Sequence, residues 1–227
     1  MKKSNIFLIT SLFLVGCQAS GKDSEEVSSS MKEQELTVLE TYLSRNERYH
    51  SILLDYTLSK DGVLFSSGSS SRRVYFGKDE NGFETKVEQR IVYQKNYASL
   101  DENDDSSIIN KTVYYSPDMT YTKMEDGTFS QKPENHEIET YELMYDLDMF
   151  RLVEETDDGK DITLKGNVID SKGFFKKDRD YQNVTCEIVF EKSSLSLTDM
   201  HIQYDVESYQ VKMDIGFGTF NDRILLP

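Results

Sequence analysis

Acid–base or nucleophilic chemistry in this chain would have to start from its histidines. His50, His136 and His201 are far apart in the sequence, and none lies in a nucleophile elbow, a serine–lysine motif or a metal-binding motif. A hydrolase would need one of them to meet a serine and a carboxylate in space. The sequence therefore predicts a protein that is not an enzyme and has no catalytic residues, with a hydrolase as the least favoured alternative.

An acidic run suggests a metal ion at first sight. Asp101 to Asp105 places oxygen ligands at alternate positions, as the start of a calcium loop does. An EF-hand then needs Gly at its sixth position and Glu at its twelfth, where this chain has Ser106 and Thr112. We interpret the run as a solvated hairpin tip, and we expect no metal ion and no cofactor.

The cysteines have different predicted roles. Cys17 follows the apolar run Ile6–Val15, which itself follows a cationic start at Lys2 and Lys3. In helical form this run spans ~15 Å, about half the hydrocarbon core of a bilayer, so it is typical of a signal peptide rather than a permanent membrane span. Cys186 lies on a predicted apolar strand without a second cysteine to pair with, so we expect a buried and inert thiol.

The residues Leu14-Val15-Gly16-Cys17 resemble a bacterial lipobox. The resemblance implies that a signal peptide, residues 1–16, is cut between Gly16 and Cys17 and that the Cys17 thiol is diacylated. Two or three acyl chains anchor stably, because each buried CH₂ contributes ~0.8 kcal/mol. The expected location is the extracytoplasmic face of the cell membrane, with a Gram-positive source preferred. In a cell with two membranes Gln18 carries no retention signal, and the outer membrane is the alternative.

Charge and composition limit the remaining possibilities. The chain has 26 basic and 41 acidic residues, a formal charge of −15 and a pI near 4.6, which excludes a nucleic-acid binder. Residues 17–30 are small, polar and charged, so they predict a flexible tether with a reach of ~20 Å. Residues 31–227 show no repeat and no shift in composition, and we expect them to form a single domain.

Apolar periodicity predicts the elements of this domain. A short amphipathic helix is predicted over residues 31–47. From Tyr49 onward the period changes to two, most clearly over residues 209–217, and this persistence indicates strands with one buried face. A second helix is predicted within residues 133–153, where Asn135 can cap it.

Together these elements predict an α+β fold that is mainly antiparallel β. A curved open sheet would carry one N-terminal helix and a helical insertion on its concave face. The lipobox, the tether, this order of elements and the ending Ile224-Leu225-Leu226-Pro227 resemble the LolA-like family of bacterial envelope lipoproteins. Over residues 31–227 the resemblance implies a half-barrel whose space between sheet and helices holds acyl chains in several members. It brings no catalytic or ligand motif with it.

Apolar stripes on the predicted strands suggest where a ligand would lie. The residues expected to line the concave side are Leu54, Tyr56, Val87, Ile91, Ile188, Phe190, Met213 and Ile215. If this space is open, the protein is an anchored binding module for a lipid or another apolar ligand. If the same residues fill a closed core, the alternative is an envelope accessory protein that binds a protein partner in secretion, conjugation or sensing.

Overall fold

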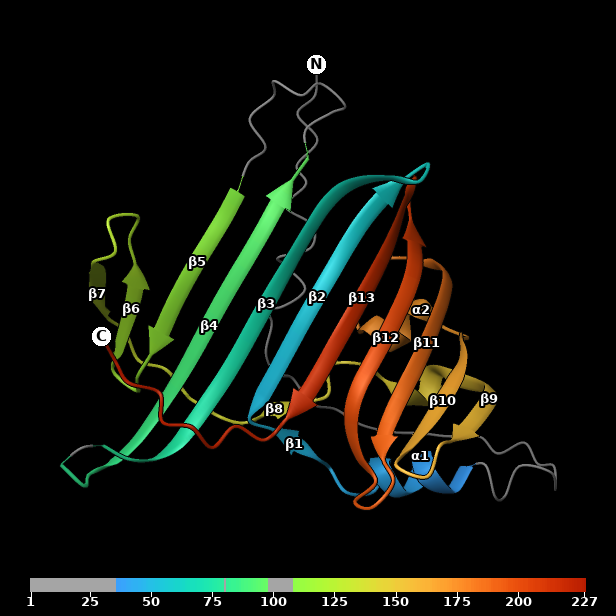
Figure 1. The fold of residues 1–227 in the computed structure, drawn as a ribbon, viewed down its shortest axis with the longest axis horizontal. Helices are drawn as coiled ribbons and strands as arrows, with labels where there is room; N and C mark the ends of the chain where they lie inside the picture. Colours follow the sequence, from blue (N-terminus) through green and yellow to red (C-terminus); the bar gives the residue numbers. More distant parts are fainter. Residues whose placement is uncertain (1–35, 80, 98–107) are drawn as a thin grey trace. The chain divides into compact units, whose positions relative to one another are not determined.

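The computed structural model describes residues 36–79, 81–97 and 108–227. Residues 35–227 form one compact unit, while residues 1–34 fall in a separate unit outside the described part of the chain. Within the described residues, eleven strands form one antiparallel sheet in the order β7-β6-β5-β4-β3-β2-β13-β12-β11-β10-β9 (Figure 1). The predicted large, open, curved and mainly antiparallel sheet is therefore confirmed.

The sheet is built almost entirely from neighbours in sequence, with β2 next to β13 as the long-range pair. Its strands are β2 (Ser51–Lys60), β3 (Val63–Lys78), β4 (Glu84–Asn96), β5 (Ile108–Tyr115), β6 (Met119–Lys123), β7 (Phe129–Pro133), β9 (Phe150–Asp157), β10 (Asp161–Val168), β11 (Gln182–Glu191), β12 (Ser196–Val206) and β13 (Tyr209–Gly218). A separate two-stranded ladder joins β1 (Arg48–Tyr49) to β8 (Tyr141–Glu142). The helical elements described are α1 (Leu36–Leu43), α2 (Ser171–Phe175) and the single-turn η2 (Leu147–Met149).

Strict alternation sets the two faces of the sheet. Met213 lies opposite Tyr56 and Ile215 lies opposite Leu54 across the β13–β2 pair, and all four side chains are buried. We call the face that carries them the inner face and the opposite face the outer face. Lys212 lies between Met213 and Val211 in β13 and is exposed on the outer face. The period of two predicted for residues 209–217 is confirmed, because a strand sends successive side chains to opposite faces.

The hairpin between β2 and β3 shows how the turns hold this register. Asp61 has φ of 51° and Gly62 has φ of 77°, so both central residues adopt left-handed backbone. A two-residue turn of this kind matches the right-handed twist of its flanking strands. The turn therefore keeps Leu58 and Tyr56 of β2 on the inner face, where both are buried.

Covering elements pack on the inner face over β2 and β9 to β13, on the far side of the sheet in Figure 1. Phe175 of α2 lies with its ring 5.1 Å from that of Tyr204 in β12. Tyr145 stacks on Phe174 of α2 at 5.2 Å. The core of the unit is therefore a layer of aromatic and aliphatic side chains between this half of the sheet and its cover.

The predicted N-terminal helix is shorter in the described chain than its apolar spacing suggested. The interval 31–47 was expected to be helical, whereas α1 spans Leu36–Leu43 and residues 31–35 lie outside the described part. Asn46 has φ of 51°, a left-handed conformation that does not continue a helix. Val38 and Tyr42, four residues apart in α1, are both buried.

The helical insertion predicted over residues 133–153 is wrong. Residues 134–149, which we call the strap, contain β8 and η2 but no α-helix. Its backbone donors bond to other segments: Glu134 N–H donates to Asp118 O at 3.0 Å and His136 N–H donates to Pro117 O at 2.9 Å. In the middle of the strap, Tyr141 and Glu142 pair with Tyr49 and Arg48 of β1, so the backbone is extended where a helix was expected.

Apolar spacing in the strap misled the helix prediction for a physical reason. Ile138, Tyr141 and Tyr145 are buried, as the helical interpretation required. An irregular segment that crosses a sheet buries residues at the same intervals when its backbone is bonded elsewhere. Burial alone therefore did not distinguish a helix from a strap.

Among the described residues, no helix is long and apolar enough to span a membrane.

The strand register makes a direct stability prediction for neighbouring residues of β13. Met213→Asp should lower the free energy of unfolding by at least about 4 kcal/mol, because it buries an unpaired carboxylate. Lys212→Asp should change it by no more than about 0.5 kcal/mol, because that side chain is exposed. Urea unfolding of the two variants checks this, and equal shifts in midpoint would contradict the register.

Candidate functional site

The residues predicted to line one cavity lie on two faces of the sheet. The register places Leu54, Tyr56, Ile188, Phe190, Met213 and Ile215 together on the inner face. Ile91 pairs with Ser71, which pairs with Leu53, so Ile91 lies on the outer face with Leu53. Val87 shares the parity of Ile91 and lies on the outer face as well. The prediction that all eight share one side is therefore wrong for Val87 and Ile91.

The inner-face residues of this set are packed by the chain itself. Ile188 and Phe190 have 0% exposure, and the other four are at most 7% exposed. A side chain without accessible surface has no water-sized void beside it. The ring of Tyr42 in α1 lies 5.2 Å from that of Phe190, which shows one source of this cover. At these positions the inner face is a filled core.

Tyrosine hydroxyls bring polar atoms into this core. The hydroxyls of Tyr42 and Tyr49 lie 2.7 Å apart in a hydrogen bond. Burial raises the pKa of Tyr42 to about 12, and it raises the pKa of Tyr145 and Tyr204 as well. These phenols therefore stay neutral at physiological pH, and each is a packing group with one hydrogen-bonding atom.

On β3 and β4 the inner face carries a cluster of charged side chains around the buried carboxylate of Glu88, in place of apolar side chains. Glu88 is 5% exposed and accepts from Arg90 Nε at 2.5 Å and from Arg90 Nη2 at 2.9 Å. Arg72 Nη2 donates to the same carboxylate at 3.2 Å, and Tyr141 of the strap donates its hydroxyl at 2.9 Å. Side chains from three elements, β3, β4 and the strap, thus meet at one carboxylate, and Glu88 holds the strap against the sheet.

The electrostatics of Glu88 are set by two opposing effects. Burial by itself would raise its pKa, but the hydrogen bonds and charge of Arg90, together with Arg72 and Tyr141, outweigh burial and lower it. The Arg72 guanidinium also lies 4.4 Å from the centre of the Tyr141 ring, a cation–π contact. The Glu88 carboxylate has all its hydrogen-bonding partners within the cluster. We therefore interpret the cluster as a structural contact between strap and sheet, which we call the lock, rather than as a reaction centre.

The histidines lie in three different settings. His136 Nε2 is 2.6 Å from Thr120 Oγ1 and 3.9 Å from Glu134 Oε2, so hydroxyl and carboxylate approach the same ring nitrogen. A relay requires the carboxylate on the other nitrogen, where it orients the ring. His50 Nδ1 is buried without a hydrogen-bond partner. Neither arrangement matches a serine hydrolase.

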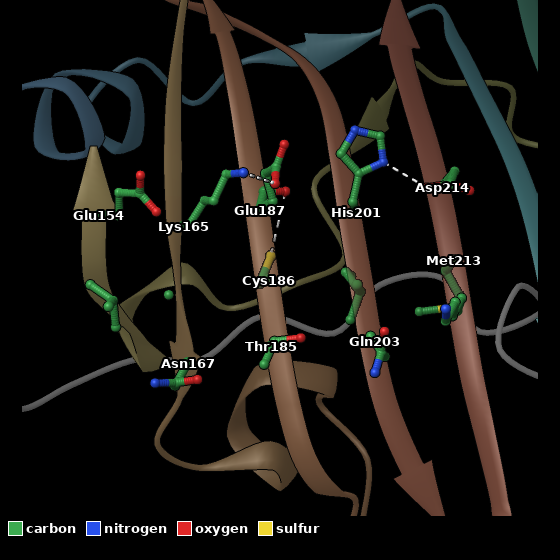
Figure 2. A pocket seen from close by; sticks show the side chains of 14 residues that line it. Glu154, Lys165, Asn167, Thr185, Cys186, Glu187, His201, Gln203, Met213 and Asp214 are labelled. Carbon is green, nitrogen blue, oxygen red and sulfur yellow. Dashed lines mark hydrogen bonds and ion pairs between the residues drawn. The ribbon is translucent and has the colours of Figure 1, made fainter. Parts of the chain in front are cut away.

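His201 belongs to a ladder of charges on the outer face. A shallow depression of about 420 Å³ crosses β9 to β13 there. Figure 2 shows Lys165 reaching Glu187, with Nζ 3.0 Å from Oε2, and His201 reaching Asp214, with Nδ1 2.6 Å from Oδ1. These four side chains pair with each other across the strands, which is the ordinary arrangement of a solvated sheet face.

Aromatic side chains gather on the outer face of β4 to β7. Tyr114 lies opposite Tyr121, and its ring is 5.9 Å from that of Phe129. Ile91 lies diagonally across from Tyr114, and Tyr93 follows it on the same face with 38% exposure. We call Ile91, Tyr93, Tyr114, Tyr121 and Phe129 the outer patch. The other four members are half-buried, so their edges remain accessible.

Sequence reasoning missed the outer patch because it assigned the stripe of β4 to the wrong face. Both Val87 and Ile91 alternate with the charged residues Glu88 and Arg90. A polar stripe normally faces solvent, whereas here Glu88 and Arg90 pair with each other on the inner face. The opposite charges of Glu88 and Arg90, two residues apart on one face of the strand, are the signal that could have revealed the inward direction of this stripe.

Other predicted sites fall outside the described residues. Cys17, the cleavage position at Gly16 and the acidic run from Asp101 to Asp105 are not among the residues that the structure describes. In the ranges that the structure describes, no group of three or more His, Cys, Asp or Glu side chains could hold a metal ion. The lipidation and the interpretation of the acidic run remain predictions.

No family model and no curated protein matches this chain. Among solved structures, LprF from Mycobacterium bovis is 13% identical, with a TM-score of 0.42 over 84% of this chain and 94% of that one. A DUF1329 family protein from Desulfovibrio piger is 11% identical, with a TM-score of 0.24 over 78% of this chain and 88% of that one. At these identities and scores, neither likeness assigns a function.

The Glu88 cluster predicts a large stability loss and a change in pH dependence. Glu88→Gln should cost about 3 kcal/mol at neutral pH, because it leaves two half-buried guanidinium groups without their counter-ion. The lowered pKa of Glu88 means that its contribution is complete above its usual 4.5 and is lost as pH falls through the folded-state value. Removing the carboxylate should therefore flatten the acid side of the stability profile.

Urea unfolding at a series of pH values measures this effect. Glu187→Gln is the matched control, since Glu187 pairs with Lys165 on the exposed outer face and should have little effect. Equal losses in the two variants would show that Glu88 is not the lock between strap and sheet.

The buried thiol makes a second prediction. Cys186 is 3% exposed, and burial raises its pKa to about 12. Since the thiolate is the reactive form, Cys186 should not react with a disulfide reagent in the folded chain. The measurement is thiol titration of a Cys17→Ser chain with and without denaturant. Reaction at the rate of a free thiol without denaturant would contradict the burial of Cys186.

Proposed function

We propose that this chain is a membrane-anchored, extracytoplasmic protein that binds a protein partner through the outer face of its sheet and catalyses no reaction. The observation that carries the proposal is the contrast between the two faces. The predicted cavity residues on the inner face are at most 7% exposed, whereas Tyr93 on the outer face is 38% exposed. An accessible apolar surface is therefore available outside the sheet.

The packed inner face weighs against an acyl-chain carrier. A carrier needs accessible apolar surface in its cavity, because burial of that surface drives uptake of the lipid. Phe190 and Ile188 offer no such surface. Uptake of a lipid would first require displacement of α1 or the strap, with loss of the contacts that hold the core.

The chemistry of the outer patch favours a protein partner. Tyrosine combines a large apolar ring with a hydroxyl, and aromatic residues are enriched at the centres of protein interfaces. Tyr114 also accepts a hydrogen bond from Gln89 Nε2 at 3.0 Å, which fixes the orientation of its hydroxyl. The patch is rigid because it lies on paired strands, so binding orders few side chains.

The proposal has two further parts: the chain is not an enzyme, and it is anchored to a membrane. Support for the first is that His136 and His201 each contact a carboxylate without the geometry of a serine relay. Support for the second is the lipobox-like sequence at Leu14 to Cys17, which would place the unit outside the cytoplasmic membrane. An anchored module of this kind acts by recruiting its partner to the membrane surface.

Native mass spectrometry of the full chain, purified gently from its host, tests this function. We expect no lipid bound to the chain beyond the acyl groups of Cys17, together with a complex with one defined protein. Tyr93→Ser combined with Tyr121→Ser should weaken that complex at least about tenfold. Val153→Ser is the control, since Val153 is 69% exposed on the edge strand β9. A stoichiometric lipid adduct would instead make the protein a carrier.

A further inference from the structure

The hairpin of β3 and β4 extends beyond its neighbours in the sheet. Pairing of β2 with β3 ends at Ser51 and Arg73, and pairing of β4 with β5 ends at Glu88 and Tyr115. The β3–β4 ladder itself continues to the pair of Lys78 and Glu84. Residues 74–87, which we call the finger, therefore project about 17 Å past the end of β2, at about 3.3 Å per residue.

The tip of the finger holds a large aromatic side chain in water. Phe83 is 71% exposed. Asp79 Oδ1 accepts the backbone N–H groups of Asn81 and Phe83 at 2.9 Å each, and Asp79 N–H donates to Phe83 O at 2.8 Å. These bonds close the turn on both sides of Phe83. The backbone at the exposed ring is thus held by hydrogen bonds to Asp79.

A second aromatic ring lies along the finger. Phe76 is 38% exposed, and the ammonium of Lys86 lies 5.7 Å from the centre of its ring. Phe76, Lys86 and Lys78 also line a depression of about 480 Å³ with Pro117. The finger therefore combines exposed aromatic surface with long cationic side chains, which is the composition of residues that lie at a membrane–water interface.

The finger points from the end of the sheet at which the chain enters the unit. β1 and β2 begin there, directly after α1, as Figure 1 shows. Arg45, just past α1, donates to Ser194 O in the turn between β11 and β12, which fixes α1 to the same end. The expected tether reaches ~20 Å from Cys17, which is close to the projection of the finger.

We propose that the finger is a membrane contact, in which Phe83 enters the interfacial region of the bilayer that holds the acyl chains of Cys17. The proposal rests on the proposed anchoring and deepens it. One acylated residue leaves the unit free to turn about its tether, whereas a second contact fixes its orientation to the membrane. The outer patch would then be held at a constant angle to that surface.

The charges of the finger define the kind of surface it takes. Lys78 and Lys86 are accompanied by Asp79, Glu80 and Glu84, so the finger carries no excess of positive charge. Attraction to anionic headgroups therefore cannot be the main contribution to the free energy of membrane binding by the finger. The contact should therefore depend on the Phe83 ring, change little with salt and occur on zwitterionic as well as anionic lipid.

The chain contains no tryptophan, so one substitution gives a unique fluorescent reporter. The Phe83→Trp variant of the full acylated chain would be bound to phosphatidylcholine–phosphatidylglycerol vesicles with brominated acyl chains. We expect a blue shift of the emission and strong quenching by the brominated lipid. Val153→Trp is the control, because Val153 is 69% exposed on β9 and should be neither shifted nor quenched.

The outcomes separate the finger from the anchor. If the wild-type chain floats with vesicles but the Phe83→Trp indole is unquenched, the finger proposal is overturned and the anchor stands. If the wild-type chain does not float with vesicles, both the anchor and the finger fail. Equal quenching in the Val153→Trp control would also overturn the proposal, since it would show general adsorption. Circular dichroism of both variants confirms that they are folded.

Discussion

The apolar inner face of β2 and β10 to β13 has to be covered by the same chain, and little of the chain is available to cover it. Two short helices and the strap supply the cover, largely through aromatic rings such as those of Tyr42 and Phe175. A large ring buries more apolar surface per residue than any aliphatic side chain. This explains how a chain with 37% hydrophobic residues closes a core against so wide a sheet.

The chemistry of the inner face changes on β3 and β4. Apolar side chains there give way to Arg72, Glu88 and Arg90, whose charges are paired with one another and with the hydroxyl of Tyr141. Such a cluster costs more to bury than an apolar layer, but it has strict geometric requirements. It therefore defines one position for the strap, and through the strap it positions the cover of the core.

Because the core is filled at the predicted cavity residues, the surface of the unit is where a partner can bind. The outer patch offers tyrosine rings on paired strands, and the finger offers Phe83, whose backbone is hydrogen-bonded to Asp79. In the proposed arrangement the acyl anchor and the finger fix the unit on the membrane, and the outer patch recruits a protein to it. Both surfaces follow from the same open sheet, whose strands differ in length and whose outer face keeps tyrosine side chains accessible on β4 to β7.

The sequence by itself determined the elements that depend on local patterns. The period of two in β13 identified Met213 and Ile215 as buried, because alternation is a property of neighbouring residues. Tertiary structure alone decided the face of β4, since alternation gives two faces and only the partners of Glu88 and Arg90 show which is inward. It also decided that the strap is not a helix, because Tyr141 and Glu142 pair with β1, a distant partner that a local pattern cannot reveal. The finger exists for the same reason: its projection is a difference in length between paired strands, and pairing is a property of the folded chain.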